Sequence, residues 1–222
     1  MEQRLTGRRL SALACLWALT ACSGAPRLEP TPGAFGFDNA LSAWRAGSTG
    51  GRGPDATWAQ RADPGAISPP NVLAVTEIDH DSEDRFNVFW RDLPAFQDGR
   101  LSLAVRADAG VVDQGGGPMW RVQDADNYYV CRFNPLEANY RVYVVRDGVR
   151  RQLATALADV RVGQWHRIEV AHEGDHIVCW LDGLKLLDVH DDTILVTGGV
   201  GLWTKADART SFDDFAVTPA LR

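Results

Sequence analysis

The chain has 222 residues, with 23 Lys and Arg against 29 Asp and Glu, so its formal net charge at pH 7 is −6. An acidic chain without a basic run is poorly suited to phosphate backbones, and we expect no nucleic-acid partner. The length suits one sizeable domain behind a short leader.

Residues 1–21 have the layout of an export signal, which is removed from the mature protein. Arginines precede the apolar run 10–19, which is shorter than the roughly 20 residues of a membrane span. The run ends in Leu19-Thr20-Ala21-Cys22, which resembles the bacterial lipobox, whose cysteine is acylated and becomes the first mature residue. An ordinary secretory signal with a chance cysteine is the alternative. We expect lipidation of Cys22, which makes the membrane a partner through the lipid.

Residues 22–33 follow as a flexible tether, because their prolines and glycines prevent a helix or a central strand. Ser23 stands where retention in the bacterial inner membrane usually requires Asp, so the resemblance to lipoproteins favours the outer membrane. We therefore expect the mature protein at the bacterial cell envelope.

Apolar and polar residues then alternate with period two, which predicts strands at 86–90, 101–106, 119–123, 128–134, 140–146, 165–171, 177–181, 201–205 and 210–217. Asp98-Gly99, Asp147-Gly148 and Asp182-Gly183 suit tight hairpin turns between strands. We predict an all-β sandwich or jelly roll over residues 34–218, with 219–222 as a C-terminal tail. Residues 35–38 are similar in character to the last strand, and we expect the two to pair and close the sandwich.

Two cysteines remain in the predicted sandwich, Cys131 and Cys179, each within a strand-like run. An oxidising compartment permits a disulfide between them, and two buried thiols are the alternative. Neither cysteine has the Cys-x-x-Cys spacing of a redox or zinc site.

Several short motifs together resemble the concanavalin A-like jelly rolls: residues 119–129, Trp165-His166, Leu181-Asp182-Gly183, residues 201–207 and Phe212-Asp213-Asp214-Phe215. More narrowly, residues 35–218 resemble bacterial envelope proteins of the laminin-G-like and 3-keto-disaccharide hydrolase group. That resemblance implies two antiparallel sheets and, for the group's enzymes, action on 3-keto-glycosides. The hydrolase-type pattern resembles Asn-Ser-Gly followed by an apolar pair and Arg, whereas residues 115–121 read Gly-Gly-Gly-Pro-Met-Trp-Arg. Only a glycine and Arg121 are kept, so the resemblance implies the fold and leaves catalysis in doubt.

Strand alternation predicts a polar sheet face that suits a sugar. Aromatic rings stack on the apolar side of a pyranose, while guanidinium and amide groups bind its hydroxyls. If the strands share one sheet, the ligand-binding face consists of Arg121, Gln123, Tyr128, Arg132, Asn134, Asn139, Arg141, Tyr143, Trp203 and Lys205. The alternative is a sheet face that is polar only because it meets water.

We expect a non-catalytic carbohydrate-binding domain whose partner is a glycan, and two other functions stay open. One is a hydrolase or lyase of 3-keto-glycosides that uses Arg121, Lys205 and a carboxylate. Glu137, in the turn 134–139, is the candidate acid or base, and a solvated turn carboxylate is the alternative. The other is a structural envelope protein that binds a protein partner.

The acidic stretch 77–84 places Glu77, Asp79 and Asp81 on one face if the strand continues. This is a near miss to the Glu-x-Asp-x-Glu motif of family 16 glycoside hydrolases, which have the same fold. A hard-cation site for Ca²⁺ and a solvated loop are the alternatives, and we otherwise expect no cofactor. His172 and His176 flank the turn 173–175 without a third ligand, so no metal site is predicted there.

We expect Cys22→Ser to give a soluble or mis-processed protein, because this variant lacks the thiol that would carry the acyl chain. Cells grown with an alkyne palmitate analogue should label the wild type and leave the variant unlabelled. Equal labelling of both proteins would contradict lipidation at Cys22.

Overall fold

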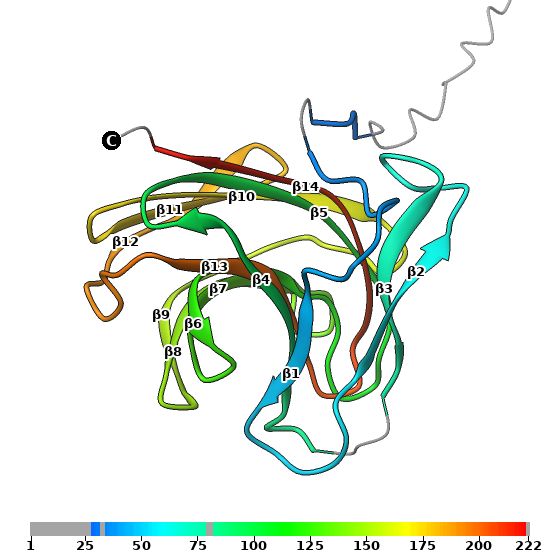
Figure 1. Ribbon diagram of the computed structural model, residues 1–222, viewed down its shortest axis with the longest axis horizontal. Helices are drawn as coiled ribbons and strands as arrows, with labels where there is room; N and C mark the ends of the chain where they lie inside the picture. Colours follow the sequence, from blue (N-terminus) through cyan, green and yellow to red (C-terminus); the bar gives the residue numbers. More distant parts are fainter. Residues whose placement is uncertain (1–27, 32–33, 79–81, 221–222) are drawn as a thin grey trace, which may run out of the picture.

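The computed structural model describes residues 28–31, 34–78 and 82–220. It shows two antiparallel sheets of seven strands each, stacked face to face (Figure 1). The first sheet has the order β1-β4-β13-β6-β7-β8-β9, with β1 (Arg45–Thr49), β4 (Phe86–Phe96), β13 (Gly198–Lys205), β6 (Gly117–Asp124), β7 (Asn127–Asn134), β8 (Asn139–Arg146) and β9 (Val149–Leu157). The second has the order β12-β11-β10-β5-β14-β3-β2, with β12 (Leu184–His190), β11 (His176–Leu181), β10 (Trp165–Glu173), β5 (Gly99–Ala109), β14 (Arg209–Pro219), β3 (Asn71–Glu77) and β2 (Thr57–Ala62). The predicted concanavalin A-like jelly roll is confirmed.

The core lies between the two sheets and is built from alternate residues of their strands. In β7, Tyr129, Cys131 and Phe133 face the second sheet and are fully buried. Leu103 of β5 and Phe212 of β14 belong to the same buried cluster. Burial of each large apolar side chain contributes about 1.5–3 kcal/mol, so this shared core holds the sheets together. Among the described residues, no helix is long and apolar enough to span a membrane.

Tight hairpins join neighbouring strands where the sequence has Asp-Gly. Asp147 and Gly148 connect β8 to β9 with φ of 51° and 75°, and Asp182 and Gly183 connect β11 to β12 with φ of 50° and 79°. Positive φ at both central residues is the type I′ geometry, which matches the right-handed twist of the flanking strands. The two turns therefore set the register of their hairpins.

The N-terminal segment closes the sandwich against β14, as the sequence predicts. Phe35 and Phe215 exchange two backbone hydrogen bonds, with N···O distances of 2.7 and 3.1 Å. Beside them, the buried Asp214 carboxylate accepts a hydrogen bond from the Thr31 backbone N–H at 2.8 Å and pairs with Arg167 at 2.6 Å. Residues 28–31 are therefore fixed against the outer side of the second sheet (Figure 1).

Cys131 and Cys179 are both free thiols, buried in the core. Burial raises the pKa of Cys179, and the neighbouring Cys131 adds to the shift. Of the two states that the sequence leaves open, the structure shows two buried thiols.

His172 of β10 is a buried imidazole between the sheets. Its Nδ1 accepts a hydrogen bond from Trp120 Nε1 at 2.9 Å, and its Nε2 has no hydrogen-bond partner in the part of the chain that the structure describes. Burial lowers the pKa of His172 to about 3, and the positive charge of Arg121 adds to this effect. The folded protein therefore keeps this ring neutral, whereas an unfolded histidine titrates near pH 6.5.

We expect the free energy of unfolding to fall as the pH drops from about 6.5 toward 4, because only the unfolded chain binds a proton at His172 in this range. Through His172, each pH unit below the unfolded pKa should lower the free energy of unfolding by up to about 1.4 kcal/mol. Urea unfolding between pH 7 and pH 4 measures this slope.

The variant His172→Asn keeps an acceptor for Trp120 and removes the titrating ring, so its pH profile should be flatter. The control His190→Asn removes an exposed histidine that pairs with Asp175, and its profile should differ from that of the wild type less than the profile of His172→Asn does. If His172→Asn has the wild-type slope, the histidine is not the titrating group.

Candidate functional site

The free face of the first sheet is concave (Figure 1). Alternation in β7 turns Tyr128, Val130 and Arg132 away from the core and onto this face. Much of the face is filled by a second buried cluster: Phe86, Val88, Met119, Val122, Tyr128, Val130, Tyr143, Val145 and Trp203. Accessible polar groups remain at the end beside the β7–β8 hairpin.

Six charged side chains gather at that end, and we call them the concave cluster: Asp113, Arg132, Glu137, Arg141, Arg150 and Lys205. Arg132 of β7 and Arg141 of β8 converge on Glu137 Oε2, at 3.0 and 3.1 Å. Arg132 also donates to Asn139 Oδ1 at 2.9 Å and to the Tyr143 hydroxyl at 3.2 Å. The structure thus brings five of the residues singled out from the sequence into one hydrogen-bonded network: Arg132, Glu137, Asn139, Arg141 and Tyr143.

Glu137 lies in the turn between β7 and β8, and its side chain is 43% exposed. Its partial burial favours the neutral acid, but hydrogen bonds from Asn139 and Arg132 and the charges of Arg132 and Arg141 outweigh burial and lower the pKa of Glu137 to about 2. The carboxylate is therefore ionised at physiological pH. A general acid must hold a proton at the working pH, so Glu137 is poorly suited to that role.

A second ion pair lies deeper in the concave cluster. Lys205, the last residue of β13, places Nζ 3.2 Å from Asp113 Oδ2, and Asn134 Nδ2 donates to Asp113 Oδ1 at 3.2 Å. Burial raises the pKa of Asp113, although the charges of Arg132 and Lys205 oppose the shift. Sequence reasoning missed Asp113 because it lies in the loop between β5 and β6, where no strand alternation marks a face.

Sequence reasoning also missed Arg150 of β9. Its guanidinium carbon lies 4.6 Å from the ring centroid of Tyr143, 4.7 Å from that of Phe86 and 5.9 Å from that of Trp203. Through the tight turn at 147–148, Arg150 pairs with Val145, and cross-strand partners share a face. Val145 and Tyr143 are two residues apart in β8 and share a face, so this pairing places Arg150 on the same face as Tyr143.

Trp203 offers no ring face to a sugar, contrary to the prediction. It is fully buried, with the Phe86 ring 5.3 Å away and the Arg150 guanidinium over it. Its Nε1 donates to the Tyr128 hydroxyl at 3.2 Å, and Tyr128 is fully buried as well. Alternation predicts which face a ring occupies, but it does not show that sheet curvature covers the ring.

Arg121 does not lie on the concave face, contrary to the prediction. A β-bulge between β6 and β13 gives Arg121 a φ of 48° and shifts the alternation, so its side chain turns to the space between the sheets. There it donates to the backbone oxygens of Gln97, Ile194 and Gly174, at 2.7, 2.6 and 2.7 Å. Gln123 donates to the Arg121 carbonyl at 3.1 Å and does not join the concave cluster either.

The predicted catalytic grouping of Arg121 with Lys205 is therefore not assembled. Arg121 lies beside Gly198, where a Cβ would come within 2.5 Å of the Arg121 backbone. Lys205 ends the same strand seven residues later, which is roughly 23 Å away at about 3.3 Å per residue.

Of the predicted metal-ligand candidates, the structure describes only some, and it does not bring these together. Asp79, His80 and Asp81 lie outside the described residues. His172 faces the core, whereas His176 stacks on His190 at 4.5 Å, so the two histidines do not meet across their turn. Over residues 28–31, 34–78 and 82–220, no three His, Cys, Asp or Glu side chains are placed to hold a metal ion.

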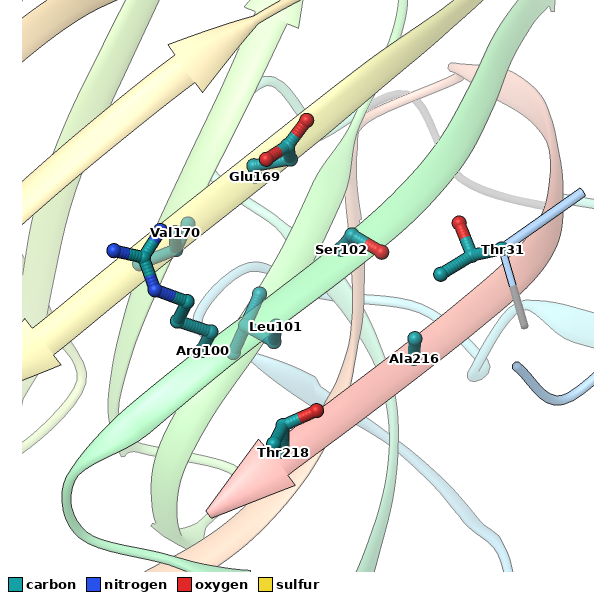
Figure 2. A pocket seen from close by; sticks show the side chains of 8 residues that line it. All are labelled: Thr31, Arg100, Leu101, Ser102, Glu169, Val170, Ala216 and Thr218. Atoms are coloured by element: carbon teal, nitrogen blue, oxygen red, sulfur yellow. The ribbon is translucent and has the colours of Figure 1, made fainter. Parts of the chain in front are cut away.

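A shallow depression of about 170 Å³ lies on the outer face of the second sheet. Figure 2 shows Arg100 and Glu169 on one side of Ser102 and Thr31 on the other. The Ser102 hydroxyl is buried without a hydrogen-bond partner in the described chain, and the Arg100 guanidinium lies 5.5 Å from the Trp180 ring centroid. This depression holds one cation and one carboxylate, so the concave cluster is the richer candidate site.

Comparison with known proteins points to a carbohydrate-related family. The model of a family described as "3-keto-alpha-glucoside-1,2-lyase-like domain" matches residues 37–218. The fold is similar to the carbohydrate binding module CBM66 from Bacillus subtilis, with a TM-score of 0.60 and 18% identity over 78% of this chain and 93% of that one. It is also similar to a lichenase derived from a mouse hindgut metagenome, with a TM-score of 0.55 and 11% identity over 82% of this chain and 95% of that one. No curated protein matches the chain in sequence.

We expect Glu137→Gln to lower the free energy of unfolding by about 1–2 kcal/mol, because it leaves the buried Arg132 guanidinium without its carboxylate. The loss stays below the roughly 3–5 kcal/mol of a fully buried pair because Glu137 is partly exposed and water screens its charge. Urea unfolding at pH 7 measures the change.

Asp92→Asn is the matched control, because its pair with Arg45 lies at the exposed surface. This change should cost less than about 0.5 kcal/mol. Equal losses in the two variants would show that Glu137 contributes no more than an exposed carboxylate.

Proposed function

The chain belongs to the 3-keto-alpha-glucoside-1,2-lyase-like domain family, and we propose that its concave cluster binds a carbohydrate without cleaving it. The observation that carries the proposal is a set of cationic donors held in place at a partly accessible surface. Arg141 is 28% exposed and Lys205 is 16% exposed, and ion pairs with Glu137 and Asp113 fix their positions. The similarity of the fold to a carbohydrate binding module supports this class of ligand.

Fixed donors and acceptors suit the hydroxyl groups of a sugar. Arg141 donates to Glu137, to the Tyr143 hydroxyl and to Thr155 Oγ1, so its guanidinium does not need to be ordered when a ligand arrives. Each hydroxyl contact exchanges a bond to water for a bond to protein, and the net gain is about 1 kcal/mol. Trp203 is covered and none of the six side chains of the concave cluster is aromatic, so stacking adds little there, and we expect a Kd in the millimolar to micromolar range, about −4 to −8 kcal/mol.

Two features of the carboxylates support binding without turnover. Glu137 reaches the surface, but its pKa of about 2 leaves no proton for a leaving group. Asp113 has a raised pKa, but its side chain is only 2% exposed behind Lys205 and Asn134. In this arrangement, the carboxylate that meets solvent does not hold a proton and the carboxylate with a raised pKa does not meet a ligand.

The second candidate function is cleavage of a 3-keto-glycoside, and the family match favours it. In such a sugar, the carbonyl acidifies the neighbouring C2–H. A base that removes this proton leaves an electron pair that forms a C1–C2 double bond and expels the C1 oxygen as the leaving group. Asp113, with its raised pKa, is the base that the structure offers, and Lys205 lies beside it. A movement of the loop between β5 and β6 would have to expose Asp113 first.

The proposal extends to location: a lipid on Cys22 holds the domain at the cell envelope, with the outer membrane favoured by Ser23. The lipobox-like sequence supports this part. A structural envelope protein that binds a protein partner is the outcome if the concave cluster binds no glycan.

We expect calorimetry on a glycan panel to give a ligand whose affinity falls about tenfold in Arg141→Ala. The variant lacks one charge-assisted contact, whose loss costs about 1.4 kcal/mol of binding free energy. The control Arg161→Ala changes an exposed arginine outside the concave cluster and should bind like the wild type. A product assay on 3-keto-glycosides runs beside it, with wild type, Glu137→Gln and Asp113→Asn.

The two assays separate the functions. Binding without product supports the first proposal. Turnover by the wild type that Asp113→Asn or Glu137→Gln abolishes would replace it with the lyase-type reaction. Absence of both binding and product would leave the protein-binding function.

A further inference from the structure

Arg150 is the unpaired cation of the concave cluster. Arg132 and Arg141 share the Glu137 carboxylate, and Lys205 pairs with Asp113. Within the described residues, no carboxylate lies within 4.0 Å of the Arg150 guanidinium, and its Nη1 is buried without a hydrogen-bond partner. A charged donor of this kind is costly to bury unless a partner satisfies it.

Aromatic rings hold the Arg150 guanidinium in place but do not satisfy it. The rings of Tyr143, Phe86 and Trp203 lie 4.6, 4.7 and 5.9 Å from its central carbon. Such cation–π contacts contribute about 0.5–2 kcal/mol and fix the plane of the group. They accept no hydrogen bond from its N–H donors, and because Nη1 is buried, the Nε–Nη2 edge is the part that a ligand on the concave face can meet.

Arg132 provides a second unsatisfied donor nearby. Its side chain is almost fully buried, and its Nε has no hydrogen-bond partner in the described chain. The guanidinium carbons of Arg132 and Arg150 lie 5.8 and 4.6 Å from the same Tyr143 ring centroid. Two unfilled guanidinium donors therefore flank one aromatic ring.

The charge of the concave cluster is opposite in sign to that of the chain. It contains four cations, Arg132, Arg141, Arg150 and Lys205, against two carboxylates, Asp113 and Glu137. The whole chain carries a formal net charge of −6. A local positive surplus in an acidic protein attracts an anionic ligand, and a planar guanidinium matches a carboxylate with two parallel hydrogen bonds.

We propose that the ligand of the concave cluster is an acidic saccharide, and that the carboxylate of a uronic-acid unit docks at Arg150. This inference rests on the proposed carbohydrate binding and names its ligand class. The Nε–Nη2 edge of the Arg150 guanidinium supplies the bidentate contact, Arg132 adds positive charge behind it, and Arg141 and Lys205 face the remaining oxygens. Binding of the carboxylate gives the unpaired cation its missing counter-charge.

The test uses matched pairs of ligands: oligosaccharides of galacturonic, glucuronic and mannuronic acid, each beside its neutral methyl ester. Calorimetry with the whole mature protein at low salt should show at least one acid bound about tenfold more tightly than its ester. Raising the NaCl concentration from 50 to 500 mM should remove most of this preference, because salt screens charge pairs that remain partly hydrated.

Arg150→Gln should reduce the preference for acid over ester to about one, while Arg150→Lys should keep part of it through charge alone. Arg146→Gln, an exposed arginine at the end of β8 in the same hairpin, should behave like the wild type. If Arg150→Gln does not fold, Arg150→Lys tests the assignment to Arg150, and the salt series on the unmodified protein tests the acid preference.

Equal affinity for acids and esters in the wild type would overturn this inference and leave carbohydrate binding intact. An acid preference that survives Arg150→Gln would overturn the assignment to Arg150. Failure to bind acids, esters and the wider glycan panel would refute the proposed function itself.

Discussion

The curvature of the first sheet is the constraint on which the concave cluster depends. Five strand spacings separate β4 from β9, and in a flat sheet these would put Phe86 and Arg150 roughly 24 Å apart. The Arg150 guanidinium carbon nevertheless lies 4.7 Å from the Phe86 ring centroid. No arginine side chain crosses a gap of that size, so the flanks of the sheet must curl toward each other until residues of distant strands meet across the concave face.

This curl decides what kind of surface the protein presents. Trp203 and Tyr128 would form an aromatic platform on a flatter sheet, but here Trp203 is buried beneath Phe86 and Arg150, and Tyr128 is buried beside it, where its hydroxyl accepts a hydrogen bond from Trp203 Nε1. The groups that remain accessible at the concave cluster are charged and held by each other, as the pairing of Arg141 with Glu137 shows. The same pairing keeps Glu137 ionised, so the geometry that orders the donors also leaves the exposed carboxylate without a proton to donate.

Period-two alternation and Asp-Gly turns were sufficient to predict a sandwich or jelly roll and the pairing of residues 35–38 with the last strand, and the motif resemblance selected the jelly roll. Alternation also placed Arg132 and Tyr143 on one face, because β7 and β8 are regular along this stretch. It failed at Arg121, where a bulge adds a residue to β6 and reverses the faces that follow. It did not reveal Asp113, which lies in a loop, or the burial of Trp203, which depends on contacts between strands far apart in the sheet. Gly117 and Arg121, which match the hydrolase-type pattern, both have structural explanations. A Cβ on Gly117 would lie 1.9 Å from the Cys131 carbonyl oxygen, and Arg121 donates to three backbone carbonyls.

The clamp on Thr31 has a mechanical consequence. Asp214 and Phe215, which hold Thr31 and Phe35, belong to β14, and β14 is an interior strand of the second sheet with β5 and β3 on either side. A pull on the N-terminal segment is therefore transmitted to β14 at its bulge between Asp213 and Ala216, and from there to β5 on one side and, at Ser211 and Phe212, to β3 on the other. An interior strand leaves its sheet only after losing its bonds to two neighbours, whereas an outermost strand has one neighbour to lose. A domain held by its N-terminus in this way would carry load through an interior strand of the second sheet.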